Sequence, residues 1–229
     1  IAPADARDYP FCFLDGQFDT TLFPVAEWRE AGRYALGSGD IGVWSAATGG
    51  LADPMLIEEL RTKILPRRGI NARAEEILIT VGAQQSLYLL AELLVDASVP
   101  VAMEEPGYPE MRHLVQRRGA PIVHQPIDGD GMLVDGALDD SRIVYVTPSH
   151  QAATGVTMSL ARRTALLAWA QRRGALVVED DYDSEFRFSP RPLEPLQALD
   201  RSGSVVYVGS FSKTLSPRLR LGFMVAPAG

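Results

Sequence analysis

A single lysine follows an apolar run near the end of the chain, in the stretch Val208-Gly209-Ser210-Phe211-Ser212-Lys213. Only two of the 22 Lys and Arg residues are lysines, so arginine supplies nearly all of the positive charge. A lysine amine, unlike a guanidinium, can lose its proton inside a protein and then form a Schiff base. The position of Lys213 therefore indicates amine chemistry.

A cluster of carboxylates follows another apolar run, in Glu179-Asp180-Asp181-Tyr182-Asp183-Ser184-Glu185. Such a cluster is typical of a divalent-metal site or of a solvated loop. Asp180, however, lies at the end of the expected strand, and a carboxylate held there needs a cationic partner to stay ionised.

Two further turns carry candidate binding groups. Gly82 stands between an expected strand and an expected helix, and Gly82, Ala83 and Gln84 would present backbone N–H groups to an anion. Tyr108 lies between Pro106 and Pro109, which fix its turn. It is either a ring that stacks on a planar ligand or a packed turn tyrosine.

One cofactor, pyridoxal 5'-phosphate, accounts for all four features together. It needs a Schiff-base lysine, a carboxylate for its pyridinium nitrogen, a stacking aromatic ring and a phosphate cradle at a helix end. These needs match Lys213, Asp180, Tyr108 and the Gly82 turn. Tyr182 would hydrogen-bond the ring oxygen.

The elements that must position these groups alternate along the chain. Strands are expected at 77–81, 99–103, 122–124, 143–146, 175–178, 205–208 and 223–225, and helices at 25–36, 53–65, 84–94, 110–118 and 159–174. The helix from Asp53 should stop at Pro66. This alternation predicts an α/β fold with a mainly parallel sheet covered on both faces, in which ligands bind at the carboxyl ends of the strands.

The composition and net charge of the chain argue against several classes of protein. The chain has 229 residues, 46% of them hydrophobic and 22% charged, and a net charge of −7. This composition argues against disorder and against nucleic-acid binding by this segment. No apolar run is long enough for a membrane span. One cysteine, Cys12, permits no internal disulfide, so we expect a cytoplasmic location.

Three other patterns are better explained without special chemistry. Gly37 to Gly42 fits G-x-G-x-x-G but lacks the preceding strand of a dinucleotide site. Ser210 to Lys213 fits S-x-x-K, yet no S-D-N or K-T-G element accompanies it. His113, His124 and His150 lack metal-ligand spacing, and we expect no metal.

The lysine segment Ser210-Phe211-Ser212-Lys213-Thr214-Leu215-Ser216-Pro217-Arg218-Leu219-Arg220-Leu221-Gly222 resembles that of the fold-type I aminotransferases. Thr147-Pro148-Ser149-His150-Gln151, Thr154-Gly155 and residues 179–187 resemble a narrower group, the MocR subfamily of GntR-type regulators. Its members join a winged-helix DNA-binding domain to an aminotransferase-like domain. The resemblance runs from about residue 77 to 225.

The resemblance implies a role for each matching residue. Lys213 would form the internal aldimine, Asp180 would bind the pyridine nitrogen, and Tyr182 the ring oxygen. Tyr108 would stack on the ring, and His150 would lie near the ring oxygen. The phosphate would be held by Gly82, Ala83, Gln84, Ser210 and Arg220.

The fold that the resemblance implies is a three-layer α/β/α sandwich with a mixed, mostly parallel sheet. Residues 1–50 would form an N-terminal linker and extension, and 51–229 the large cofactor-binding domain, without the C-terminal small domain. The chain would form homodimers, and DNA would be bound only by a separate N-terminal winged-helix domain.

Two functions remain open at this point. The chain is either the effector domain of a regulator, in which an amino acid or amine forms an external aldimine, or a working aminotransferase. Two departures from the family pattern are also visible: Ala153 replaces a loop proline, and the stretch from Trp44 to Gly50 lacks the tyrosine expected in a loop that reaches the partner subunit.

Overall fold

The computed structural model describes Phe11, residues 20–37, 39, 41, 42, 45, 46, 52–183, 185, 186 and 193–227. The helices are α1 (Val25–Ala35), α3 (Pro54–Glu59), α4 (Leu65–Arg67), α5 (Ala83–Leu94), α6 (Pro109–Arg117), α7 (Leu160–Arg173) and α8 (Leu196–Leu199). The strands are β1 (Ile77–Thr80), β2 (Val101–Glu105), β3 (Ile122–Asp128), β4 (Gly131–Met132), β5 (Ile143–Val146), β6 (Leu176–Asp181), β7 (Val205–Ser210) and β8 (Gly222–Val225).

The eight strands form one sheet in the order β1-β8-β7-β6-β5-β2-β3-β4. Strands β3, β2, β5, β6 and β7 run parallel to one another, whereas β8 is antiparallel to both β7 and β1, and β4 to β3. The expectation of a mixed, mostly parallel sheet is confirmed. The short apolar runs form buried strands because helices cover both faces.

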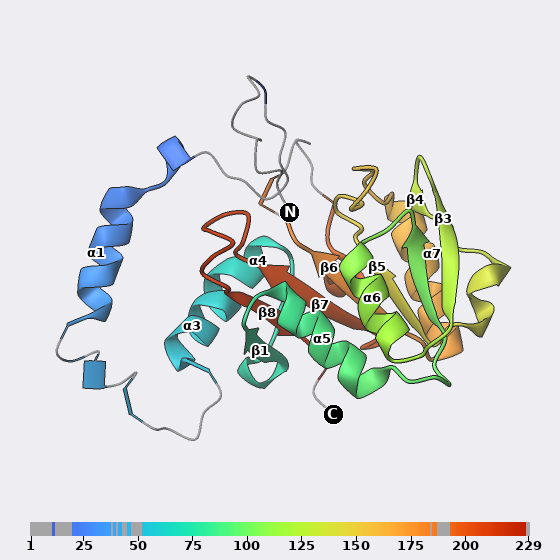
Figure 1. The fold of residues 1–229 in the computed structure, drawn as a ribbon, viewed down its shortest axis with the longest axis horizontal. Coiled ribbons are helices and arrows are strands. Elements are labelled where there is room, and N and C mark those ends of the chain that lie inside the picture. The colour runs from blue at the N-terminus through green and yellow to red at the C-terminus, as the bar shows by residue number, and fades with distance from the viewer. Residues whose placement is uncertain are drawn as a thin grey trace.

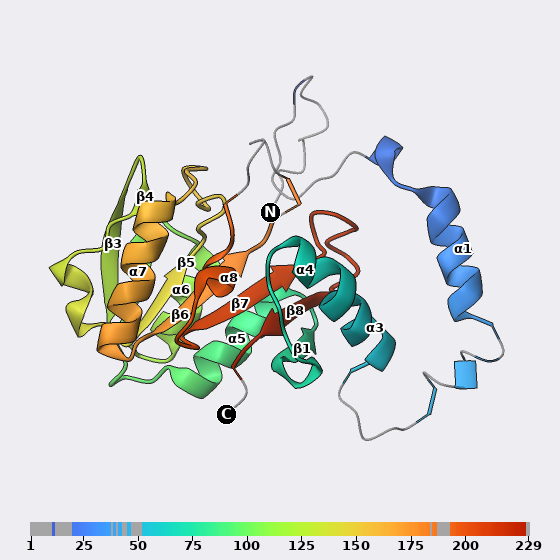
Figure 2. The same cartoon turned by 180° about the vertical axis from the view of Figure 1, so that it is seen from behind.

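The helices form a layer on each side of this sheet. Helices α5 and α6 cover the face seen in Figure 1, and α7 and α8 cover the face seen in Figure 2. Leu87, Met111 and Val178 belong to the core under the first layer, and Leu166 and Val177 to the core under the second. Successive strand residues alternate between these two cores, as the pleat requires.

The helix expected to stop at Pro66 is longer and less regular than predicted. It passes from α3 through a π-helical turn, Leu60–Ile64, into α4, which ends at Arg67. Pro66 lies in the first turn of α4, where its missing N–H is tolerated. Buried Leu60 and Leu65 pack this segment against β7 and β8.

Helix α1 lies apart from the sheet in both views (Figures 1 and 2), and none of its residues is buried. Most of the stretch 1–51 lies outside the described residues, including Cys12, Trp44 and residues 47–50. The described helices include none that is long and apolar enough to cross a membrane.

Candidate functional site

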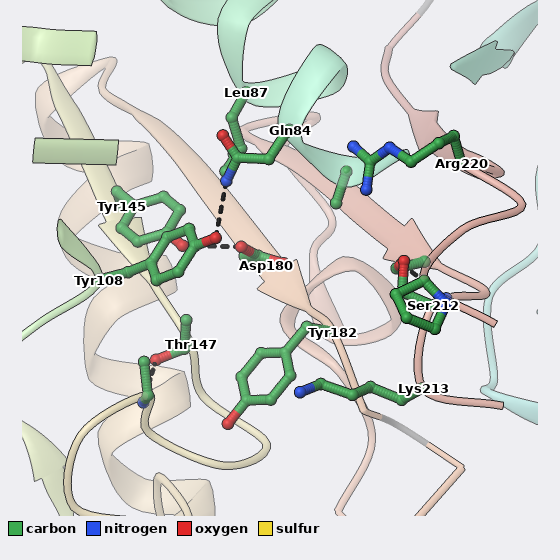
Figure 3. A pocket seen from close by; sticks show the side chains of 14 residues that line it. Gln84, Leu87, Tyr108, Tyr145, Thr147, Asp180, Tyr182, Ser212, Lys213 and Arg220 are labelled. Carbon is green, nitrogen blue, oxygen red and sulfur yellow. Dashed lines mark hydrogen bonds between the residues drawn. The ribbon is translucent and has the colours of Figure 1, made fainter. Parts of the chain in front are cut away.

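A cavity of about 310 Å³ opens at the carboxyl ends of β5, β6 and β7, beside the start of α5 (Figure 3). This is the edge at which parallel sheets bind their ligands. Fourteen residues line the cavity: Ala83, Gln84, Leu87, Tyr108, Tyr145, Thr147, Ala152, Asp180, Tyr182, Ser210, Ser212, Lys213, Pro217 and Arg220.

Eight of the ten residues proposed from the sequence lie around this one cavity, although they come from distant parts of the chain. They are Ala83, Gln84, Tyr108, Asp180, Tyr182, Ser210, Lys213 and Arg220. Gly82 and His150 are not among the lining residues. Gly82 directly precedes the lining residue Ala83, and the His150 carbonyl accepts a hydrogen bond from the lining residue Tyr182.

The start of α5 forms one end of the cavity. Gly82 has φ +76 and precedes the helix, and no side chain caps the first turn. This positive φ favours glycine, and a Cβ on Gly82 would also lie 2.8 Å from Nη2 of Arg220, so the guanidinium would have to move away from the helix start. Nη2 of Arg220 donates to the Val81 carbonyl at 3.3 Å. An uncapped helix N-terminus beside an arginine fits a phosphate group.

The serine turn after β7 completes this end. Ser210 and Ser212 both line the cavity, and the Ser212 N–H donates to Oγ of Ser210 at 3.0 Å. Gln84 has a second task, because its Nε2 donates to the Tyr108 hydroxyl at 2.7 Å. This bond joins the start of α5 to the start of α6 and fixes the Tyr108 ring at the cavity wall.

Asp180 lies at the other side of the cavity, near the end of β6, and is 5% exposed. Its Oδ2 accepts a hydrogen bond from the Tyr145 hydroxyl at 2.7 Å, whereas its buried Oδ1 has no hydrogen-bond partner among the described residues. Burial raises the pKa of Asp180 to about 7, helped by the nearby carboxyls of Asp181 and Asp183.

Lys213 and Tyr182 lie side by side among the residues that line the cavity (Figure 3). Nζ of Lys213 is 5.8 Å from the centre of the Tyr182 ring. The Tyr182 hydroxyl donates to the His150 carbonyl at 3.1 Å, and Nδ1 of His150 lies 2.8 Å from Oδ2 of Asp183. The loop after β5 and the loop after β6 are thus joined at this point.

The buried carboxyl of Glu104 holds the loop after β5 through hydrogen bonds. Glu104 is 1% exposed, and its Oε2 accepts from the Thr147 N–H and hydroxyl at 3.2 and 2.7 Å and from Gln151 Nε2 at 3.3 Å. Burial raises the pKa of Glu104. The residues of this loop that line the cavity are Thr147 and Ala152, whereas His150 is not among the lining residues.

The carboxylates of the acidic stretch do not converge on one point. Glu179 accepts from the backbone N–H groups of Leu196 and Gln197, whereas Asp180 binds Tyr145 and Asp181 binds Tyr207. Within the described residues no cluster of His, Cys, Asp or Glu is suited to a metal ion. The divalent-metal interpretation is therefore not supported there.

Sequence reasoning assigned no role to six of the lining residues: Leu87, Tyr145, Thr147, Ala152, Ser212 and Pro217. Of these, Tyr145 had a usable signal. It is a polar side chain in a buried strand, and it faces Val178 in the β5–β6 register, two residues before Asp180. Residues i and i+2 of a strand share a face, so Tyr145 and Asp180 lie on the same face of the sheet once this register is known.

The sequence profile of the family "Aminotransferase class I and II" matches residues 15–228. The chain belongs to this family. Its cofactor is pyridoxal 5'-phosphate, and the cavity fits that group: an uncapped helix start with Arg220 suits the phosphate, and the unpaired oxygen of Asp180 suits a protonated ring nitrogen.

Two curated relatives carry the names of transcription regulators. The chain is 41% identical to the HTH-type transcriptional regulator TauR of Rhodobacter capsulatus over 96% of its length and 46% of TauR. It is 38% identical to the probable rhizopine catabolism regulatory protein MocR of Rhizobium meliloti, over 94% of its length and 44% of MocR. The chain thus spans about half the length of these relatives, and the resemblance to the MocR group is confirmed.

The fold is shared with solved aminotransferases. The α-aminoadipate aminotransferase LysN of Thermus thermophilus, solved with N-(5'-phosphopyridoxyl)-L-leucine, superposes with a TM-score of 0.79 at 34% identity. The match covers 94% of this chain and 56% of LysN. The expected fold type is therefore confirmed.

Proposed function

We propose that this chain is the pyridoxal 5'-phosphate-binding effector domain of a MocR/GntR-type transcription regulator. Its ligand would be an amino acid or an amine. The observation that carries this proposal is the pairing of a regulator-type sequence with a cavity that retains Lys213 and Asp180. Such a protein would work in the cytoplasm, as a homodimer, and bind DNA through a separate N-terminal winged-helix domain.

In this proposal, different lining residues would bind different parts of the cofactor. The start of α5, Ser210 and Arg220 would hold the phosphate, Tyr108 would cover a ring face, and Lys213 would hold the cofactor covalently through Nζ. When bound, the cofactor supplies an aldehyde that condenses with amines and a ring that accepts electrons.

The remaining side chains would control protons. Asp180 would keep a proton on the ring nitrogen through its unpaired Oδ1. Tyr182 would donate to the ring oxygen in place of the His150 carbonyl. The Nζ of Lys213, once an amino ligand has replaced it, would be a base beside that ligand.

The regulatory step would be a shift between two conformations of the whole protein. An amino ligand that binds one conformation more tightly than the other moves the equilibrium by that difference in affinity. The winged-helix domain would then bind its DNA differently.

The proposal is tested with the full-length gene product loaded with pyridoxal 5'-phosphate. Visible absorbance is titrated with a panel of amino acids and amines, and the ligand found is then added to a DNA-binding assay. We expect Lys213→Ala to lose the visible band of the lysine-bound cofactor and the DNA response, while its circular dichroism stays that of the wild type.

Lys63→Ala is the matched control, because Lys63 is the other lysine and forms an exposed pair with Glu59. It should keep both the band and the response. A band that survives Lys213→Ala would contradict the role of Lys213.

A working aminotransferase is the second candidate, favoured by the likeness to LysN. Turnover of an amino donor with a keto acid, without any change in DNA binding, would establish it in place of the regulator.

A further inference from the structure

The sheet contains two neighbouring carboxylates, Asp180 and Asp181, whose side chains point to opposite faces because they are consecutive in β6. Each accepts a hydrogen bond from a buried tyrosine: Asp180 from Tyr145 at 2.7 Å, and Asp181 from Tyr207 at 2.6 Å. The two tyrosine–aspartate pairs differ in whether a cation lies near the carboxylate, and Asp180, the carboxylate that lines the cavity, has none nearby among the described residues of the sheet.

The Asp181 pair includes a cation. Nη1 of Arg68 donates to the Tyr207 hydroxyl at 2.6 Å, and Arg68 is itself 5% exposed. Burial lowers the pKa of this guanidinium, but Tyr207, Asp181 and Glu185, with which Arg68 forms an ion pair, together raise it above its ordinary value. Asp181 therefore lies near a buried cation, which it shares with Glu185, although Oδ1 of Asp181, like that of Asp180, has no hydrogen-bond partner among the described residues.

The Asp180 pair has no such cation built into the described part of the sheet. The groups that act on Asp180 are the Tyr145 hydroxyl from β5, Glu104 from β2, and Asp181 and Asp183 from β6 and its loop. None of these carries a positive charge. The cations that line the cavity, Lys213 and Arg220, come from the segment between β7 and β8.

We propose that Tyr145 is a positioning residue that holds Oδ2 of Asp180 and so presents Oδ1 to a cationic group in the cavity. A hydroxyl suits this task because it orients a carboxylate without neutralising it. Tyr145 is 1% exposed and keeps its proton at every physiological pH, so it is a permanent donor to Asp180.

The hydrogen bond from Tyr145 determines which oxygen of Asp180 would carry a proton. Because Oδ2 already accepts from Tyr145, a proton on Asp180 would reside on Oδ1, the oxygen without a partner in the described structure. Without the Tyr145 hydroxyl, both oxygens would be equivalent acceptors, and the buried Oδ2 would lack a donor.

The test compares Tyr145→Phe with Tyr207→Phe. Both substitutions remove one hydroxyl from a fully buried tyrosine–aspartate pair and keep the ring, but only the first pair faces the cavity. We measure the Kd for pyridoxal 5'-phosphate and, in the cofactor-free protein, the pKa of Asp180 by carboxyl ¹³C NMR.

We expect Tyr145→Phe to raise the Kd about tenfold, which corresponds to about 1.4 kcal/mol, and to raise the Asp180 pKa. Tyr207→Phe should change the Kd less than about twofold, which corresponds to about 0.4 kcal/mol. Equal losses in both variants, or a Tyr145→Phe protein with the wild-type Kd and Asp180 pKa, would overturn the proposal.

A double-mutant cycle separates the positioning of Asp180 from a general effect of Tyr145→Phe on the fold. In an Asp180→Asn background the Tyr145 hydroxyl has no carboxylate to position, so adding Tyr145→Phe should leave the Kd unchanged. A further loss of the same size as in the wild-type background would show that Tyr145 acts only on the fold.

The inference rests on the proposed cofactor site, and the two can fail separately. A wild-type protein that binds no pyridoxal 5'-phosphate contradicts the proposed function, whereas wild-type binding that Tyr145→Phe leaves intact contradicts only the role of Tyr145.

Discussion

The buried side chain of Asp180 suits a ligand in the cavity but lowers the stability of the folded protein at neutral and higher pH. Its carboxyl is buried, and burial raises its pKa to about 7 from the ordinary value of 3.8. Between these two values the unfolded chain has released the proton and the folded protein still holds it. The contribution of Asp180 to stability is therefore highest at low pH, falls as the pH rises through this window, and is lowest above about pH 7.

The sign of this effect gives a prediction for Asp180→Asn. The amide has no proton to lose, and its oxygen can still accept from Tyr145. We expect the cofactor-free variant to be more stable than the wild type at pH 8, by roughly 2–4 kcal/mol, with the difference vanishing near about pH 4. Urea unfolding at both pH values measures it.

The same variant should bind pyridoxal 5'-phosphate more weakly, because an amide cannot balance a pyridinium charge. Asp130→Asn, on the exposed turn between β3 and β4, is the control for a simple loss of charge. If Asp180→Asn is no more stable than the wild type at pH 8, then the pKa of Asp180 is not raised in the cofactor-free protein.

At the scale of elements, the start of α5 packs closely against Gly222, which ends the lysine segment and begins β8. A Cβ on Gly222 would lie 2.7 Å from the Gly82 carbonyl carbon and 2.8 Å from the Ala83 nitrogen. Both contacts are to backbone atoms, which cannot rotate away. The first residue of β8 must therefore be a glycine for the helix start to lie where it does.

We accordingly expect Gly222→Ala to destabilise the protein by about 1–3 kcal/mol, in the range of overpacked cores. Because the helix start moves, the affinity for inorganic phosphate and for the cofactor should fall as well. Gly136→Ala is the matched control, since a Cβ there meets nothing within 4 Å. Thermal unfolding and a phosphate titration measure the two effects, and equal behaviour of both variants would contradict the crowding.

The elements also show where sequence reasoning succeeds. The strands and the longer helices follow from hydrophobic periodicity, and most of the candidate site residues follow because they lie at or just after the end of a strand, or at the start of a helix. Helix α8 was not predicted, because its four residues form no periodic pattern. It is held by the buried carboxylate of Glu179, which accepts from its first N–H groups at 2.8 and 2.9 Å.

Contacts between distant segments account for the other differences. Strand β3 extends to Asp128 because the short strand β4 pairs with its end in a hairpin, a partner that local sequence does not indicate. Likewise, the Tyr145–Asp180 bond depends on the β5–β6 register. Residues 149–155 follow the family pattern only in part, and the position that reaches the cavity, Ala152, could be found only from the structure.

At the scale of the whole molecule, the cavity joins segments that are otherwise far apart in the chain. Its lining comes from the regions of residues 83–87, 108, 145–152, 180–182 and 210–220. A ligand that contacts all of them binds only when the sheet and its helices are assembled, so its binding energy adds to the stability of the folded state.

We therefore expect pyridoxal 5'-phosphate at about 100 times its Kd to stabilise the protein by about 2.7 kcal/mol. For a chain of this size that is a rise in Tm of roughly 5–10 °C. Differential scanning calorimetry measures it, with pyridoxal lacking the phosphate as the control ligand. A Tm that pyridoxal raises as much would contradict phosphate binding at the start of α5.

The crowding among Gly82, Arg220 and Gly222 also limits how this protein can diverge. Arg220 itself adopts φ +51, unusual for a residue with a side chain, and its guanidinium fills the space that a Cβ on Gly82 would need. Gly82 adopts φ +76, and a Cβ at position 222 would meet backbone atoms, so a substitution at either glycine cannot be relieved by changing a neighbouring side chain. In a library of random variants, substitutions at Gly82 and Gly222 should therefore be depleted, and second changes at Arg220 should not restore them.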